Sequence, residues 1–230
     1  MTSALILSGA GRYADPWHPF AQTSACLAEI LTGCGITVTI ATDVDAAMTR
    51  LDGVDLLVVN AGDPSRNDDL PGPDRPGPDR TARDLTAARA GFAAALQRGI
   101  KVLGTHTAAA SLPDYPEWEA VLGGRWLSGR SMHPPIGPAR ITLHPDRHPV
   151  VAGLLDFDTV DERYSGLRVA ADVVPLATHI HGGVEHPLLW ARTAGASRVV
   201  YSALGHDARA YESCELAELL TRAVRWLTGP

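Results

Sequence analysis

The stretch that most constrains the fold of this chain is residues 99–110, G-I-K-V-L-G-T-H-T-A-A-A. Its aliphatic first half predicts a short buried strand, Gly104 permits a tight turn, and the alanines after Thr107 favour the start of a helix. His106 is therefore expected on the turn itself. In open α/β folds such a corner lies at the carboxyl edge of the sheet, where ligands bind and the backbone amides at the helix start point outward.

The pattern G-x-His-x-A around His106 has the shape of a nucleophile elbow, G-x-Ser/Cys-x-G, with an imidazole in place of the hydroxyl or thiol. These residues alone leave two interpretations open. Either His106 takes part in chemistry at the sheet edge, or it caps a helix there as a structural residue.

The rest of the chain predicts alternating strands and helices around this corner. Strands are expected at 4–7, 36–41 and 54–60, and helices at 20–32, 44–51 and 81–98. This β-α-β-α-β order is typical of a parallel sheet covered on both faces. We therefore predict a three-layer α/β fold with a mostly parallel central sheet.

The second half of the chain is richer in short strands and turns. Strands are expected at 139–144, 157–164, 173–179, 187–191 and 198–202, before a closing helix over 216–227. No linker of disordered composition separates the halves, so residues 1–230 are expected to form one domain. A Pro/Gly-rich surface loop is predicted over 64–80, where P-G-P-D-R occurs twice in tandem, and we expect it to be dispensable for folding.

Composition narrows the classes of partner. Of 230 residues 45% are hydrophobic, which allows a substantial core, and a net charge of -6 with scattered Lys and Arg argues against nucleic acid or an anionic membrane surface. A small-molecule ligand is expected, and a homo-oligomer is compatible with the sequence. Three cysteines without C-x-x-C spacing, no signal-peptide pattern and no apolar run of membrane-spanning length favour a cytoplasmic location. Gly9 and Gly11 lack the third glycine of a dinucleotide fingerprint, so no nucleotide cofactor is expected.

Histidines provide the candidate chemistry, because imidazole titrates near neutrality and binds metals. His206, like His106, directly follows a predicted strand. In V-D-E-R-Y at 160–164, Asp161 and Glu162 would point to opposite faces of a strand, so that only one of them faces a given site. The spacing His179-x-His181 allows both rings on one strand face, although a solvated strand edge before two glycines is the favoured interpretation.

Several motifs, taken in order, resemble the trehalose utilisation (ThuA-like) family, which has the class I glutamine amidotransferase-like fold, a flavodoxin-like architecture. They are L-I-L-S-G near the start, His18, G-T-H-T-A at 104–108, L-G-G-R-W at 122–126, His133-Pro134, H-P-V at 148–150, D-E-R-Y at 161–164 and S-A-L-G-H at 202–206.

This resemblance implies that His106 occupies the elbow position at which amidotransferases of this fold carry a cysteine, and that His206 matches their later histidine. Without a thiol or hydroxyl at the elbow, thioester chemistry on glutamine is excluded. The resemblance also implies a link to sugar catabolism, where ThuA-like proteins are associated with keto derivatives of trehalose and related glycosides.

Two hypotheses follow. The first is an enzyme of hydrolase or isomerase type acting on a sugar or keto-sugar, with catalytic residues His106, His206, Glu162 and Asp161 and substrate-binding residues His18, Trp17, Arg12, His133, Tyr164 and Trp126. Its histidines act either as metal-free acids and bases or as ligands of a divalent ion such as zinc, the candidate ligands being His106, His206, His18 and His133. The second hypothesis is a non-catalytic ligand-binding or interaction domain that kept the fold.

Overall fold

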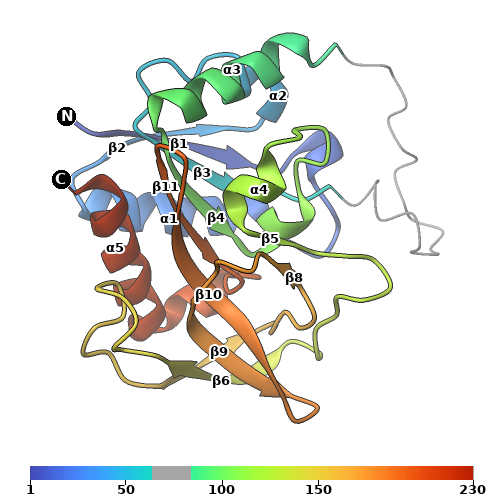
Figure 1. The fold of residues 1–230 in the computed structure, drawn as a ribbon, viewed down its shortest axis with the longest axis vertical. Helices are drawn as coiled ribbons and strands as arrows, with labels where there is room; N and C mark the ends of the chain where they lie inside the picture. The colour runs from blue at the N-terminus through green and yellow to red at the C-terminus, as the bar shows by residue number, and fades with distance from the viewer. Residues whose placement is uncertain (64–83, 230) are drawn as a thin grey trace.

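The fold is described from a computed structural model, which covers residues 1–63 and 84–229. The Pro/Gly-rich loop expected at 64–80 lies outside the described residues. Within the described part, nine strands form one sheet in the order β2-β1-β3-β4-β11-β10-β9-β6-β7 (Figure 1).

Five neighbouring strands of this sheet run parallel. In sheet order they are β2 (Thr37–Ala41), β1 (Ser3–Ser8), β3 (Leu56–Asn60), β4 (Lys101–Thr105) and β11 (Ser197–Ser202). With β11 as the fifth parallel strand, this order is the flavodoxin-like 2-1-3-4-5. The ligand crevice of such a sheet lies beyond the carboxyl ends of its strands.

The remaining four strands continue the sheet in antiparallel fashion. They are β10 (Val184–Ala194), β9 (Pro175–His181), β6 (Gly137–Leu143) and β7 (Phe157–Asp161). A separate two-stranded sheet pairs β5 (Gly124–Arg125) with β8 (Arg168–Val169). The predicted α/β fold with its parallel central sheet is confirmed, and the antiparallel extension follows from hairpins that need no crossover helix.

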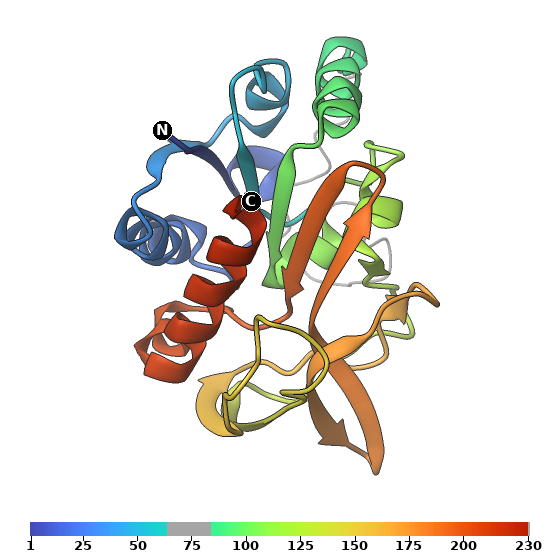
Figure 2. The same ribbon diagram turned by 60° about the vertical axis from the view of Figure 1, so that its left-hand side comes forward.

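Helices cover both faces of the sheet. In Figure 2, α1 (Phe20–Gly33) and α5 (Cys214–Thr228) lie on one side, and α3 (Thr86–Arg98) and α4 (Trp118–Leu122) lie on the other. The short helix α2 (Val44–Met48) packs against α3. Three single 3-10 turns complete the described elements, namely η1 (Gly11–Tyr13), η3 (His106–Ala110) and η4 (Ala208–Glu212).

The core follows the periodicities of the sequence. Every residue of β3 is buried, as expected for a strand covered on both faces. Helix α5 buries the stripe predicted from its 3.6-residue repeat: Leu216, Leu219, Leu220, Ala223, Val224 and Leu227. Within the described residues, no helix combines the length and the hydrophobicity needed to cross a bilayer.

Candidate metal centre

The loop after β4 carries His106 on a strained corner. His106 has φ +42°, in the left-handed region that residues other than glycine rarely adopt, as the elbow pattern predicts. The Tyr201 hydroxyl donates to the His106 carbonyl at 2.8 Å, and the His106 Nδ1 lies 2.7 Å from the Ala203 carbonyl oxygen. A carbonyl can only accept, so Nδ1 carries the proton and Nε2 is left as a free base.

Burial fixes the protonation state of His106. Its side chain is buried, and this burial lowers its pKa to about 4, although Glu162 acts in the opposite direction. His106 is therefore neutral at pH 7. Its Nε2 is buried and makes no hydrogen bond, which leaves an unpaired acceptor inside the protein.

The loop after β11 supplies His206, and the end of β7 supplies Glu162. One carboxylate oxygen of Glu162, Oε2, lies 3.1 Å from His206 Nδ1 and 3.4 Å from His106 Nε2. Burial raises the pKa of Glu162, but the two imidazoles outweigh it and hold this pKa well below its usual range. Burial lowers the pKa of His206, and the Glu162 carboxylate more than reverses that effect. Glu162 is thus an anion between two imidazoles.

Asp161 faces away from this point and holds the backbone instead. Its carboxylate accepts hydrogen bonds from the backbone N–H groups of Gly205 at 2.7 Å, His206 at 3.1 Å and Glu162 at 2.8 Å. Gly205 has φ +114°, and an added Cβ there would meet the Tyr211 hydroxyl at 2.6 Å, so this turn requires glycine. Of the two adjacent carboxylates only Glu162 reaches the cluster, and it follows the end of β7, whereas the sequence pattern assumed that it lies on the strand.

The third imidazole comes from the loop between η1 and α1. His18 Nδ1 donates to both carboxylate oxygens of Asp15, at 2.7 and 2.8 Å, so Nε2 is the ring nitrogen that remains available to a metal ion. This atom is also buried without a hydrogen-bond partner. The His18 ring centre lies 5.0 Å from that of His106 and 4.7 Å from that of His206. Sequence reasoning missed Asp15, although its position three residues before His18 is a recognisable pattern.

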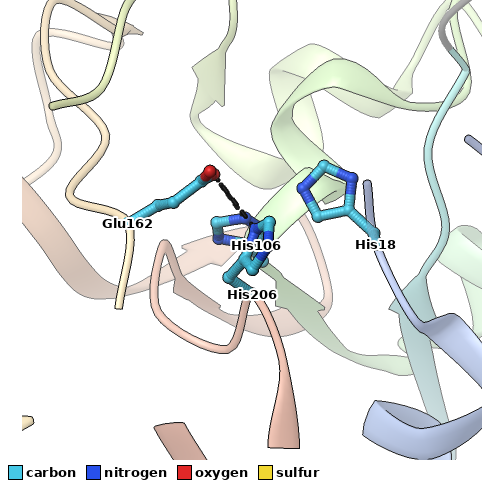
Figure 3. Close-up of side chains that lie close together, drawn as sticks. All are labelled: His18, His106, Glu162 and His206. Carbon is cyan, nitrogen blue, oxygen red and sulfur yellow. Dashed lines mark ion pairs between the residues drawn. The ribbon is translucent and has the colours of Figure 1, made fainter. Parts of the chain in front are cut away.

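These four side chains form one cluster, which we call the His3Glu cluster: His18, His106, His206 and Glu162. Each offers one ligand atom, and these atoms all lie within 4.8 Å of one another. Figure 3 shows Glu162 and His18 reaching from opposite sides toward the rings of His106 and His206. Three imidazole nitrogens and a carboxylate are a donor set that suits Zn²⁺ and neighbouring divalent ions. The Asp15 and Ala203 contacts orient two of the rings as outer partners of metal-bound histidines do.

The cluster opens into a cavity of about 490 Å³, which we call the inner cavity. Its wall includes Trp17, Trp126 and Tyr164, three flat apolar surfaces predicted to bind substrate. The Tyr164 ring centre lies 4.3 Å from that of His106 and 4.6 Å from that of Trp126. The volume falls within the usual range for small-molecule sites.

His133 also lines this cavity but stands outside the His3Glu cluster. Its Nδ1 lies 3.4 Å from Glu162 Oε1 and 3.0 Å from the Pro134 carbonyl oxygen. Its side chain is 36% exposed, against 10% for His206. The structure therefore places His133 beside Glu162 and not among the four converging groups.

Two residues lie in other surroundings than the sequence predicts. Arg12, expected to bind substrate, does not line the inner cavity; its guanidinium donates to Asp114 at 2.8 Å and Asp45 at 3.2 Å and ties η1 to the neighbouring loops. His179, expected on a solvated strand edge, is buried, because β9 lies between β10 and β6 and not at an edge. Its Nε2 lies 3.1 Å from the Tyr164 carbonyl oxygen.

Comparison with known proteins identifies the family and the fold of this chain. The family model for trehalose utilisation, ThuA, matches residues 4–227. The chain belongs to the ThuA family. No curated protein matches this ThuA-family sequence.

Solved structures show the same fold. A ThuA-like protein from Parabacteroides merdae superposes with a TM-score of 0.75 at 19% identity, over 99% of this chain and 90% of that one. A cytoplasmic protein from Salmonella typhimurium gives 0.62 at 13% identity, over 99% of both chains. A glutamine amidotransferase from Thermotoga maritima gives 0.57 at 10% identity, over 100% of this chain and 99% of that one. The predicted amidotransferase-like fold is thereby confirmed.

Proposed function

We propose that this ThuA-family protein is a metal-dependent enzyme of carbohydrate catabolism, acting as a hydrolase or isomerase on a sugar or keto-sugar such as an oxidised trehalose-type glycoside. The observation that carries this proposal is the meeting of three imidazole nitrogens and one carboxylate at the sheet's ligand edge, with the Nε2 atoms of His18 and His106 buried and without a hydrogen bond. Unpaired buried acceptors cost free energy unless a ligand satisfies them, and a divalent cation does so without a proton.

Different residues of the site are proposed to bind the metal ion and to bind the sugar. His18, His106, His206 and Glu162 would hold the ion, and their neutral rings and single anion leave it with net positive charge. When bound, a divalent ion supplies Lewis acidity toward a sugar carbonyl or hydroxyl oxygen. Trp126 and Tyr164 offer flat faces on which a sugar ring can stack.

Proton transfer is assigned to His133. It is the cavity-lining imidazole outside the His3Glu cluster, and its partial exposure lets it exchange protons with solvent. The carboxylate of Glu162 beside its Nδ1 orients the ring. We propose that the reaction takes place in the cytoplasm, as the sequence predicts; the Salmonella protein of the same fold is described as cytoplasmic.

Metal content tests the proposal. Protein purified without a polyhistidine tag is expected to hold about one equivalent of zinc or a neighbouring ion, and Glu162→Gln is expected to weaken zinc affinity by roughly 10- to 100-fold because it removes the only anionic ligand. His181→Ala, a histidine substitution outside the cluster, serves as matched control. Equilibrium dialysis with elemental analysis gives both values.

Chelation and turnover complete the test. Chelator is expected to lower the melting temperature of the wild type and to abolish turnover of keto-sugars, while His133→Ala keeps the metal and loses turnover. Sub-stoichiometric metal together with activity untouched by chelator would overturn the metal-dependent function. Full turnover in His133→Ala would remove that residue from proton transfer.

A further inference from the structure

A second hollow adjoins the inner cavity. It has a volume of about 430 Å³, and we call it the outer hollow. Trp17 and His18 belong to the walls of both spaces. Gln22, Asp207 and Arg209 complete the polar part of its wall. Its volume too lies within the range of small-molecule sites.

Adjacent residues of two loops form the partition between the two spaces. In the loop before α1, His18 belongs to the His3Glu cluster and Trp17 precedes it. In the loop after β11, His206 lines the inner cavity and the next residue, Asp207, lines the outer hollow. Trp17 and His18, which line both spaces, therefore mark the place where the inner cavity and the outer hollow meet.

The wall of the outer hollow combines a flat apolar surface with a neutral polar pair. Trp17 is 53% exposed, so its indole offers a flat apolar surface to a ligand in this hollow. Arg209 donates to Asp207 through Nε at 3.1 Å and through Nη2 at 2.6 Å. The carboxylate cancels the charge of the guanidinium, yet unused N–H groups and lone pairs remain for hydroxyl groups.

The charge balance separates classes of ligand. Near this hollow Arg209 forms an ion pair with Asp207. Asp15 is a further anion nearby, and it contacts the ring of His18. A phosphate or carboxylate would meet no uncompensated cation among these groups, so it would lose hydration without gaining a partner. A neutral, hydroxylated group exchanges its water contacts for hydrogen bonds to the pair and for stacking on the indole.

We propose that the outer hollow binds the neutral, hydroxylated remainder of a glycoside whose reacting unit occupies the inner cavity. Trp17 is the stacking surface shared by the two parts, and the Asp207–Arg209 pair determines specificity for the remainder. The proposal rests on the proposed function for the reacting unit, and it adds a binding site, a size requirement of two rings and a preference against phosphorylated remainders.

Calorimetric titration of the zinc-loaded protein tests the outer hollow with three probes: glucose, trehalose and trehalose 6-phosphate. Trehalose is expected to bind about tenfold more tightly than glucose, and its phosphate more weakly than trehalose. Arg209→Ala is expected to remove most of the difference in affinity between trehalose and glucose and to leave the affinity for glucose unchanged. Arg140→Ala is the matched control, since Arg140 forms a similar exposed pair with Asp158 at 2.9 Å on β6 and β7.

The outcomes separate this site from the metal centre. Equal affinities for glucose and trehalose, absence of trehalose binding, or an unchanged difference in affinity in Arg209→Ala each overturn the outer hollow as a subsite. Tighter binding of the phosphate overturns the assigned ligand class. If the protein binds zinc but binds trehalose no more tightly than glucose, the metal centre is supported and the subsite is not. If it binds no zinc but still binds trehalose more tightly than glucose, the subsite is supported and the metal centre is not.

Discussion

At the scale of single residues, Asp161 shows how a group that never touches the cavity can control it. Its carboxylate is almost fully buried and accepts the backbone N–H groups of Glu162, Gly205 and His206. Burial raises its pKa to about 7, while the three N–H donors act in the opposite direction. Two members of the His3Glu cluster are positioned through these bonds.

Asp161→Asn is therefore expected to damage the site without removing any ligand. The amide oxygen retains acceptor capacity, but the NH₂ group would face backbone N–H donors that have no acceptor. We expect zinc affinity to fall by about tenfold, as for other outer partners of metal ligands, with a loss of a few degrees in melting temperature. Asp158→Asn, at an exposed position of the same strand, is the control. Wild-type zinc affinity in Asp161→Asn would show that Asp161 does not position the ligands.

At the scale of elements, the contact between α2 and α3 depends on one glycine. A Cβ added at Gly91 in α3 would overlap the backbone carbonyl oxygen of Met48 at the end of α2. Alanine in place of glycine favours a helix by about 1 kcal/mol. Overpacking against a backbone atom costs roughly 1–3 kcal/mol, because no side-chain rotation relieves it.

The steric cost is expected to exceed the helix propensity. Gly91→Ala should therefore lower the free energy of unfolding by up to roughly 2 kcal/mol. Gly33→Ala is the matched control, since Gly33 ends α1 with no atom within 4 Å of an added Cβ, and it should be neutral or stabilising. Denaturant titration of both variants measures the difference. A stabilised Gly91→Ala would mean that α2 and α3 separate at little cost.

At the scale of the whole molecule, the site joins the two halves of the sheet. His18, His106 and His206 follow the parallel strands β1, β4 and β11, whereas Glu162 follows β7 at the far end of the antiparallel half. The contact between β7 and the η4 segment brings the two ends together. The four ligand groups can therefore come together only when the antiparallel half of the sheet is folded.

The free energy of unfolding at acidic pH is expected to depend on His179, which lies in the antiparallel half of the sheet. Burial lowers its pKa to about 4 from an ordinary value of 6.5, so between these pH values the unfolded chain binds more protons than the folded one. Its stabilising contribution is complete above pH 6.5 and is lost as pH falls toward 4, by up to about 3 kcal/mol. His179→Gln should flatten this part of the stability profile, measured on chelator-treated protein by denaturant titration at several pH values. His181→Gln, nearer the exposed end of β9, is the control, and an identical slope in wild type and His179→Gln would contradict the assignment.

Much of the architecture could be predicted because it depends on local patterns. The aliphatic run of β3 and the apolar stripe of α5 each depend on their own neighbours, so periodicity was sufficient to predict them. The same holds for the position of His106 on a strand-to-helix corner. The turn predicted at Gly104 was wrong: Gly104 lies within β4, where an added Cβ would meet Leu122 at 2.6 Å, and the chain turns at His106. Within the described residues, the helix predicted over 81–98 begins at Thr86, where Asp84 accepts a hydrogen bond from the Thr86 N–H.

The composition of the cluster was decided by tertiary structure. The sequence by itself determined the family, the parallel half of the sheet and the histidines that follow its strands. Only the folded chain decided that Glu162, and not Asp161, completes the cluster, that His133 stands beside it, and that Arg12 lies elsewhere. The physical reason is that these side chains come from segments up to 188 residues apart, from His18 to His206, so their distances depend on sheet order and loop packing and not on local periodicity.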